Sequence, residues 1–357
     1  MCHKELTWRR RQALLTSVLL AMAFPWSIEA QYSPGDTPVG WTGDGLLFFR
    51  SHVWVWEVSY TNDEAYDVSC EGSGLYALTS NGSIAEILTG EPTCDLIFAD
   101  HWDVSEDGGA LLVGHRRGKR EPDQLVSLLD LSTLDRQIFH SDEAGDLQSP
   151  EWVAPGAWAF VASGYPTGML RITRRGPAES RLVAELSRGW IEDFDRANDQ
   201  LIVRSYAPGR DTVMLFDTLG RLDATWPSPG TRGWTRKGDL MAYLRNVNHL
   251  PETGLVSARP ADWALIVRDM TTGEDRELFR TEQEGIFEKG HSPAHTWGPF
   301  RNGTPMDPLL WSLDGSYLVV PRIFDQGTTL WRVPLNGAPA VQLTFRDPGS
   351  APTPPRP

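Results

Sequence analysis

The chain has 357 residues, with 33 Lys plus Arg against 47 Asp plus Glu and a formal charge of −14. Nucleic acid and anionic membrane surfaces require a cationic footprint, so this charge argues against both as partners. The one basic run, residues 115–120, follows an apolar strand-like segment. We interpret it as a solvated hairpin tip, with an anion-binding patch as the alternative.

Residues 1–30 have the layout of a signal peptide. Lys4 and three consecutive arginines precede an apolar run over residues 13–24, and small residues suited to cleavage end at Ala23 or Ala30. The apolar run is shorter than the roughly 20 residues of a membrane span. We predict export to the periplasm or the exterior by the ordinary secretory route rather than the twin-arginine route, with no stable membrane insertion after cleavage. An uncleaved anchor is the alternative.

A ten-residue pattern recurs along the rest of the chain. Its clearest copy, residues 311–320, reads Trp-Ser-Leu-Asp-Gly-Ser followed by Tyr-Leu-Val-Val. Weaker copies begin at Trp41, Val68, Val104, Trp152, Phe194 and Trp234. Asp and Gly suit a tight turn, since Asp bonds nearby amides and Gly accepts a positive φ, and the apolar run after them is typical of a buried strand.

Most copies are followed by two more strand-like runs before the next copy begins, which gives four strands per unit. Between Val68 and Phe345 we count six such units, at about the spacing of propeller blades. The fold class is therefore predicted as all-β, a β-propeller of six four-stranded blades over residues 36–346. The Trp41 copy has no clear fourth strand, and is either a partial seventh blade or an N-terminal hairpin. Residues 347–357 are Pro-rich and predicted to be disordered.

The closing residues 330–335 and the Gln-Leu-Thr at residues 342–344 complete a pattern similar to the WD40-like, TolB-type periplasmic propeller repeat. The resemblance covers roughly residues 41–346, and the copy at Trp311 keeps Trp, Ser, Asp and Gly together. It implies a β-propeller in an exported protein. TolB itself has an α/β domain ahead of its propeller, whereas a few residues separate the leader from Trp41 here. The propellers of dipeptidyl-peptidase-like enzymes also use these repeats.

Cys70 and Cys94 are the cysteines that follow the leader. An oxidising compartment makes their pairing plausible, and in the predicted blade both lie at connections that emerge at one end. We predict a disulfide worth about 3 kcal/mol in the chain-entropy view. Two buried thiols are the alternative.

Two connections, residues 246–261 and 281–307, are too long for ordinary turns. Loops beyond about 12–15 residues are usually functional or disordered. Strand alternation places both on the same face of the propeller, so we predict the binding site there. Its candidate residues are His249, Glu252, His291, His295 and Trp297.

We expect no catalytic residue, cofactor or metal. His291 and His295 are spaced like metal ligands on a helix, which is the hint of a metal ion, but Pro293 between them interrupts a helical turn. Trp297 is read as a stacking platform for a sugar or peptide, or as a loop anchor. Glu192, Asp193 and Asp195 form a carboxylate cluster at a predicted strand end, with calcium as the functional alternative.

The leading functional hypothesis is an exported, non-enzymatic propeller that binds a protein, peptide or glycan through its long loops. The alternative is a propeller lyase or hydrolase acting on a sugar or ester, with His and carboxylate groups in the central funnel. No nucleophile elbow, phosphate loop or dinucleotide fingerprint is present to favour catalysis. The identity of the ligand and the oligomeric state are left open by these patterns.

Overall fold

The structure is a computed structural model. It describes residues 29–32, 35–43, 45–51, 54–59, 64–69, 73–89, 99–115, 126–139, 146–164, 167–174, 176–187, 189–207, 210–247, 262–280, 286–287, 300–301, 304–305, 308–324 and 327–345. In this part of the chain the elements are strands, apart from one 3-10 turn, η2 (Pro177–Glu179). The fold class is therefore all-β, as predicted.

Most of the described strands fall into four-stranded antiparallel units, which we number one to six in chain order. Units two to five are separate sheets, and units one and six are joined in one nine-stranded sheet. Unit one holds β2 (Gly35–Thr42), β3 (Gly45–Ser51), β6 (Gly74–Thr79) and β7 (Ile84–Thr89), and unit two holds β8 (Ala99–Val104), β9 (Ala110–His115), β10 (Val126–Asp130) and β11 (Arg136–Phe139). Unit three holds β12 (Asp146–Ala154), β13 (Ala157–Gly164), β14 (Thr167–Thr173) and β15 (Arg181–Leu186), and unit four holds β16 (Gly189–Asp195), β17 (Gln200–Ala207), β18 (Arg210–Asp217) and β19 (Leu222–Pro227). Unit five holds β20 (Thr231–Lys237), β21 (Leu240–Asn246), β22 (Trp263–Asp269) and β23 (Asp275–Arg280), and unit six holds β27 (Leu310–Trp311), β28 (Tyr317–Phe324), β29 (Gly327–Pro334) and β30 (Val341–Gln342).

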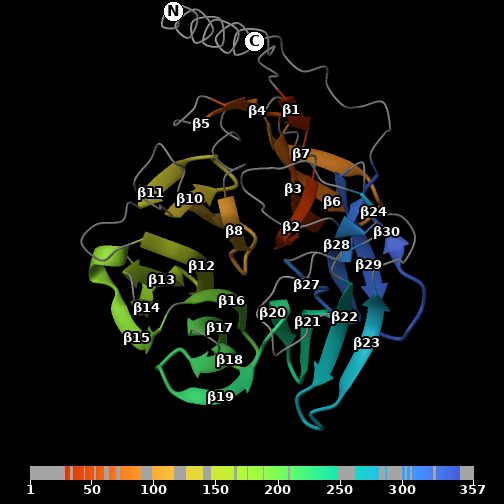
Figure 1. Cartoon of the computed structure of the whole chain (residues 1–357). Helices are drawn as coiled ribbons and strands as arrows, with labels where there is room; N and C mark the ends of the chain where they lie inside the picture. The colour runs from red at the N-terminus through yellow and green to blue at the C-terminus, as the bar shows by residue number, and fades with distance from the viewer. Residues whose placement is uncertain are drawn as a thin grey trace, which may run out of the picture.

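The units stand side by side around a centre, with the first strand of each innermost (Figure 1). Each first strand also contacts the first strand of the next unit. This arrangement is a β-propeller. Because strands alternate in direction, the connections between strands one and two and between three and four emerge on one face, here called the short-turn face. The other connections emerge on the opposite face, here called the long-connection face.

The position of the Val68 copy is a correction to the sequence analysis. It ends β5 (Glu64–Ser69), which pairs with β4 (Trp54–Ser59) in a separate sheet that also holds β1 (Glu29–Tyr32). Strand β6 pairs instead with β3, from Leu46↔Leu78 to Arg50↔Gly74. The Trp41 copy therefore opens a complete unit, and β4 and β5 are an insertion within it rather than the start of the next.

The predicted Asp-Gly turns are confirmed in units two and six. Ser105 Oγ donates to Asp107 Oδ1 at 2.6 Å, and Ser312 Oγ donates to Asp314 Oδ1 at 2.8 Å. Gly108 and Gly315 follow with φ of 71° and 70°. A side chain at these two positions would be strained, which explains why the pattern requires glycine.

Apolar side chains fill the spaces between neighbouring units. Each of six buried clusters joins residues of two adjacent units, and the sixth joins Leu46 and Phe48 of unit one to Val319 and Leu330 of unit six. Burial of these faces supplies the main stabilisation of the ring.

Candidate functional site

The residues predicted for the binding site lie outside the described part of the chain. His249 and Glu252 fall between β21 and β22, while His291, His295 and Trp297 fall between β24 (Ile286–Phe287) and β25 (Phe300–Arg301). Cys70 and Cys94 also lie outside it. The binding residues and the disulfide therefore stay predictions.

The base of the second long connection is described. Strands β24 and β25 pair antiparallel, with Phe287 opposite Phe300. Strand β26 (Thr304–Pro305) then pairs with β28, placing Pro305 opposite Arg322, and it also contacts β22. The described parts of this connection are thus attached to units five and six.

An arginine lies on aromatic rings at this anchor. The guanidinium carbon of Arg322 is 4.3 Å from the ring centre of Phe279 and 4.2 Å from that of Trp331, and the residue is 2 % exposed. In unit five, Arg232 lies 4.1 Å above the ring of Trp263. Stacking of a guanidinium group on aromatic rings is favourable in shielded positions, so these contacts stabilise the parts of units five and six to which the connection is attached.

Polar side chains also gather on the first strands of units two to four; we call His101, Asp103, Glu151 and Asp193 the inner-strand cluster. His101 Nε2 lies 2.8 Å from Glu151 Oε2, with side-chain exposures of 17 % and 8 %. Asp103 Oδ2 accepts the backbone N–H of Trp152 at 2.6 Å. These contacts connect β8 of unit two to β12 of unit three. Both strands lie near the centre of the ring (Figure 1).

The third carboxylate of the cluster connects unit four to unit five. Asp193 Oδ2 accepts the hydroxyl of Thr235 at 2.5 Å and the backbone N–H of Arg236 at 3.0 Å. The neighbouring Asp195 Oδ2 lies 3.2 Å from Arg236 Nε and accepts a hydrogen bond from Asn198 Nδ2 at 2.6 Å. The predicted strand end at residues 192–195 is confirmed as the end of β16, and protein donors occupy its oxygens.

Burial controls the ionisation of these acids. It raises the pKa of Asp103 and of Glu151 well above their usual ranges, and the neighbouring carboxylates Glu151 and Asp193, respectively, raise them further. Burial also raises the pKa of Asp193, although the Thr235 hydroxyl opposes the shift. A proton is therefore held in the cluster at pH values where ordinary carboxyls are ionised.

His101 and Glu151 were missed by sequence reasoning. They are 50 residues apart, and neither belongs to a local motif. Aligning the first strands of successive units was the one available signal, since such strands are neighbours in a propeller. Among the described residues, no group of three or more His, Cys, Asp or Glu side chains is arranged to hold a metal ion.

Comparison with known proteins gives a likeness of fold. No protein-family model matches the sequence, and no curated protein matches it. Among solved structures, TolB from Acinetobacter baumannii has a TM-score of 0.49 at 12 % identity, covering 90 % of this chain and 80 % of that one. A chain of the nidogen/laminin complex has a TM-score of 0.49 at 8 % identity, covering 87 % and 92 %.

An oligogalacturonate lyase from Vibrio parahaemolyticus is also similar, with a TM-score of 0.44 at 13 % identity over 89 % of this chain and 79 % of that one. No helix in the described residues has the length and apolar character needed to cross a membrane. At these identities and TM-scores the likeness concerns the overall fold alone; the β-propeller itself is established by the arrangement of the strands.

Proposed function

We propose that this protein is an exported propeller that binds a protein, peptide or glycan at its long-connection face. The observation that carries the proposal is the anchored connection between units five and six. In its described parts Phe287 pairs with Phe300, and β26 pairs with β28. Residues 288–299 contain three of the predicted binding residues. Loops held on a rigid scaffold are the usual place for recognition.

The use of the inner carboxylates supports binding over catalysis. Asp103 and Asp193 accept backbone N–H groups from the next unit, so their oxygens join strands together. A general acid or base must instead reach a reacting group. Export follows from the predicted leader, residues 1–30, so the propeller, residues 36–346, is proposed to act in the periplasm or outside the cell, with a Cys70–Cys94 disulfide.

The test replaces residues 288–299 by a short Gly-Ser turn that keeps the β24–β25 pair. A matched control replaces the turn at residues 80–83, on the short-turn face, by the same sequence. Chemical cross-linking and mass spectrometry on the native envelope fraction should then show a specific protein or glycan lost from the first variant and kept by the second. Recovery of the same protein or glycan in equal amount with both variants would contradict the proposal.

The His101–Glu151 contact favours one alternative, a lyase or hydrolase acting on a sugar or ester at the centre of the ring. A histidine beside a carboxyl of raised pKa is a common acid–base arrangement. Under this alternative, turnover of a panel of chromogenic esters and glycosides falls about 100-fold or more in the His101→Gln variant. Absence of turnover in the unmodified protein excludes that panel's chemistry.

A further inference from the structure

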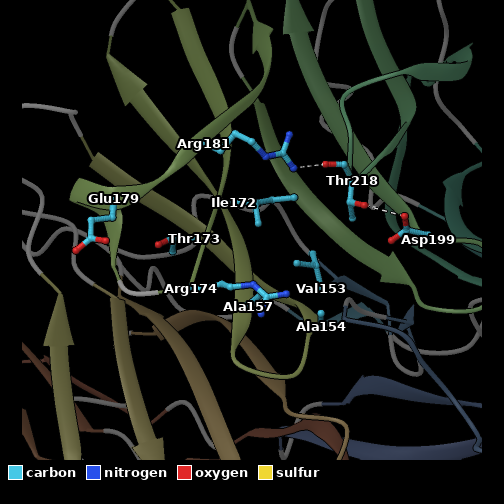
Figure 2. A pocket seen from close by; sticks show the side chains of 10 residues that line it. All are labelled: Val153, Ala154, Ala157, Ile172, Thr173, Arg174, Glu179, Arg181, Asp199 and Thr218. Atoms are coloured by element: carbon cyan, nitrogen blue, oxygen red, sulfur yellow. Dashed lines mark hydrogen bonds between the residues drawn. The ribbon is translucent and has the colours of Figure 1, made fainter.

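A groove of about 440 Å³ lies between units three and four on the short-turn face. Its walls come from the connection between β14 and β15, from the turn between β12 and β13, and from the turns of unit four that carry Asp199 and Thr218 (Figure 2). This volume falls within the range of sites for small ligands. The groove shares no residue with the long-connection face or the inner-strand cluster.

Two arginines flank the groove without a carboxylate partner. Arg174 and Arg181 are both exposed, and neither forms an ion pair with any carboxylate in the described part of the chain. Arg181 Nη2 donates to the backbone oxygen of Thr218 at 2.6 Å, which holds its guanidinium at the groove.

Two carboxylates, Asp199 and Glu179, line the same groove, and among the described residues neither forms an ion pair with Arg174 or Arg181. Asp199 Oδ2 accepts the hydroxyl of Thr218 at 2.7 Å, so it is held on the wall formed by unit four. Figure 2 shows the carboxylate of Glu179 at the left of the view, with both guanidiniums nearer the middle. The arginine charges therefore remain available to an incoming anion.

Between the two arginines the groove is apolar. Ile172 lies between Arg174 and Arg181 in Figure 2, and Val153 and Ala157 continue the surface beside it. This apolar surface beside the guanidiniums favours a ligand with an apolar group next to its charge.

The turn of unit four that carries Thr218 is held in place by a close approach of the backbone. A Cβ on Gly220 would lie 2.4 Å from the backbone oxygen of Val183, so this turn rests directly on β15 of unit three. This glycine-dependent contact fixes Thr218 relative to Arg181. The groove is consequently preformed rather than assembled on binding.

We propose that this groove binds a peptide carboxylate, lying between Arg174 and Arg181, with an adjacent apolar side chain covering Ile172. Guanidinium groups match the geometry of a carboxylate with two parallel hydrogen bonds. Either a C-terminal carboxylate or an acidic side chain next to an apolar residue supplies this chemistry.

The test uses fluorescein-labelled peptides and fluorescence anisotropy on the mature chain. The three probes are Gly-Ser-Ala-Leu with a free C-terminus, the same peptide as its amide, and the amide of Gly-Ser-Glu-Leu. We expect Arg174→Gln and Arg181→Gln each to weaken binding of the carboxylate probes by about tenfold. If the first probe binds most tightly, the carboxylate comes from a C-terminus. If the third probe binds most tightly, it comes from an acidic side chain.

Arg276→Gln is the matched control, because Arg276 is also exposed but lies on β23 of unit five, away from the groove. It should leave the affinity unchanged. All three variants change exposed side chains, so thermal unfolding should be unaltered and a loss of affinity is then specific. Equal weakening by Arg276→Gln, or no binding of any probe at millimolar concentration, overturns the proposal.

Discussion

Asp103 and Asp193 each reach from the first strand of one unit to the backbone of the first strand of the next. Asp103 accepts Trp152 N–H at 2.6 Å, and Asp193 accepts Arg236 N–H at 3.0 Å. A buried carboxyl in this role has a cost, since burial disfavours its ionised form and raises its pKa. The contacts between neighbouring units therefore depend in part on carboxyl groups whose protonation changes with pH.

The raised pKa of Asp103 sets the direction of a pH effect on stability. The folded state retains a proton that the unfolded state releases, so the group's stabilising contribution is complete below the ordinary carboxyl pKa and is lost as pH rises through the folded pKa. The Asp103→Asn variant keeps an acceptor oxygen for Trp152 and cannot ionise. The Tm of this variant minus that of the unmodified protein should increase as pH rises from about 4 to 8.

Asp107 provides a control of opposite sign for this measurement. The Ser105 hydroxyl lowers the pKa of Asp107, so its contribution is present above the ordinary carboxyl pKa and is lost as pH falls. Asp107→Asn should therefore lose Tm relative to the unmodified protein on the alkaline side. A difference in Tm between Asp103→Asn and the unmodified protein that is constant with pH would contradict the assignment.

At the scale of elements, the Ser-x-Asp-Gly turn closes the first hairpin of units two and six. In unit six, Ser312 Oγ accepts Tyr317 N–H at 3.1 Å and Asp314 Oδ1 accepts Ser316 N–H at 3.0 Å. The hydrogen bond from Ser316 N–H and those from the two serine hydroxyls lower the pKa of Asp314 to about 2. The turn is thus a local structure that the sequence pattern encodes directly.

Replacing Gly315 by Ala tests the backbone requirement of this turn. Gly315 has φ of 70°, which a residue with Cβ adopts at a cost, so we expect Gly315→Ala to lower the free energy of unfolding by about 1 kcal/mol. Gly43 is the matched control: its φ is not positive and a Cβ there would meet no atom within 4 Å. In urea unfolding, Gly43→Ala should be neutral or slightly stabilising; equal losses for both would contradict the role of φ.

These turns explain how far the fold could be predicted from sequence. Asp-Gly turns and apolar strands are local, so their repetition reveals the propeller without any knowledge of long-range pairing. Strands β4 and β5 also form a local antiparallel pair, and no local signal distinguishes such an insertion from the opening of a unit. The Val68 copy was therefore assigned to the wrong strand. The His101–Glu151 contact depends on packing between units, which local patterns do not encode.

At the scale of the molecule, the ring closes where unit six meets unit one. The first unit is built from the N-terminal strands and the sixth from the C-terminal ones, so no strand is exchanged between the ends among the described elements. Closure rests instead on the parallel contact Gly35↔Thr328, on the hydrogen bond from Trp41 Nε1 to the backbone oxygen of Trp311 at 2.7 Å, and on the shared apolar cluster. Such a closure depends on side chains more than on a continuous ladder.

Trp41 is the residue through which this closure can be tested. Trp41→Phe removes the hydrogen-bond donor and retains most of the ring that meets Tyr317 edge-on at 6.3 Å, so the free energy of unfolding should fall by about 1 kcal/mol. Trp41→Ala also removes the packing and should cost about 2–3 kcal/mol, below the value for a fully buried Trp because Trp41 is half-buried.

The location of the effect distinguishes closure from general destabilisation. Hydrogen exchange in Trp41→Ala should accelerate first in β2 and in β27 to β29, because opening of the ring exposes these edges before the cores between units two to five. The control is Trp331→Phe, which removes a hydrogen bond to Thr329 within unit six and should leave exchange in β2 unchanged. Acceleration spread evenly over all six units in Trp41→Ala would mean that the ring unfolds as one body, with no weak point where its ends meet.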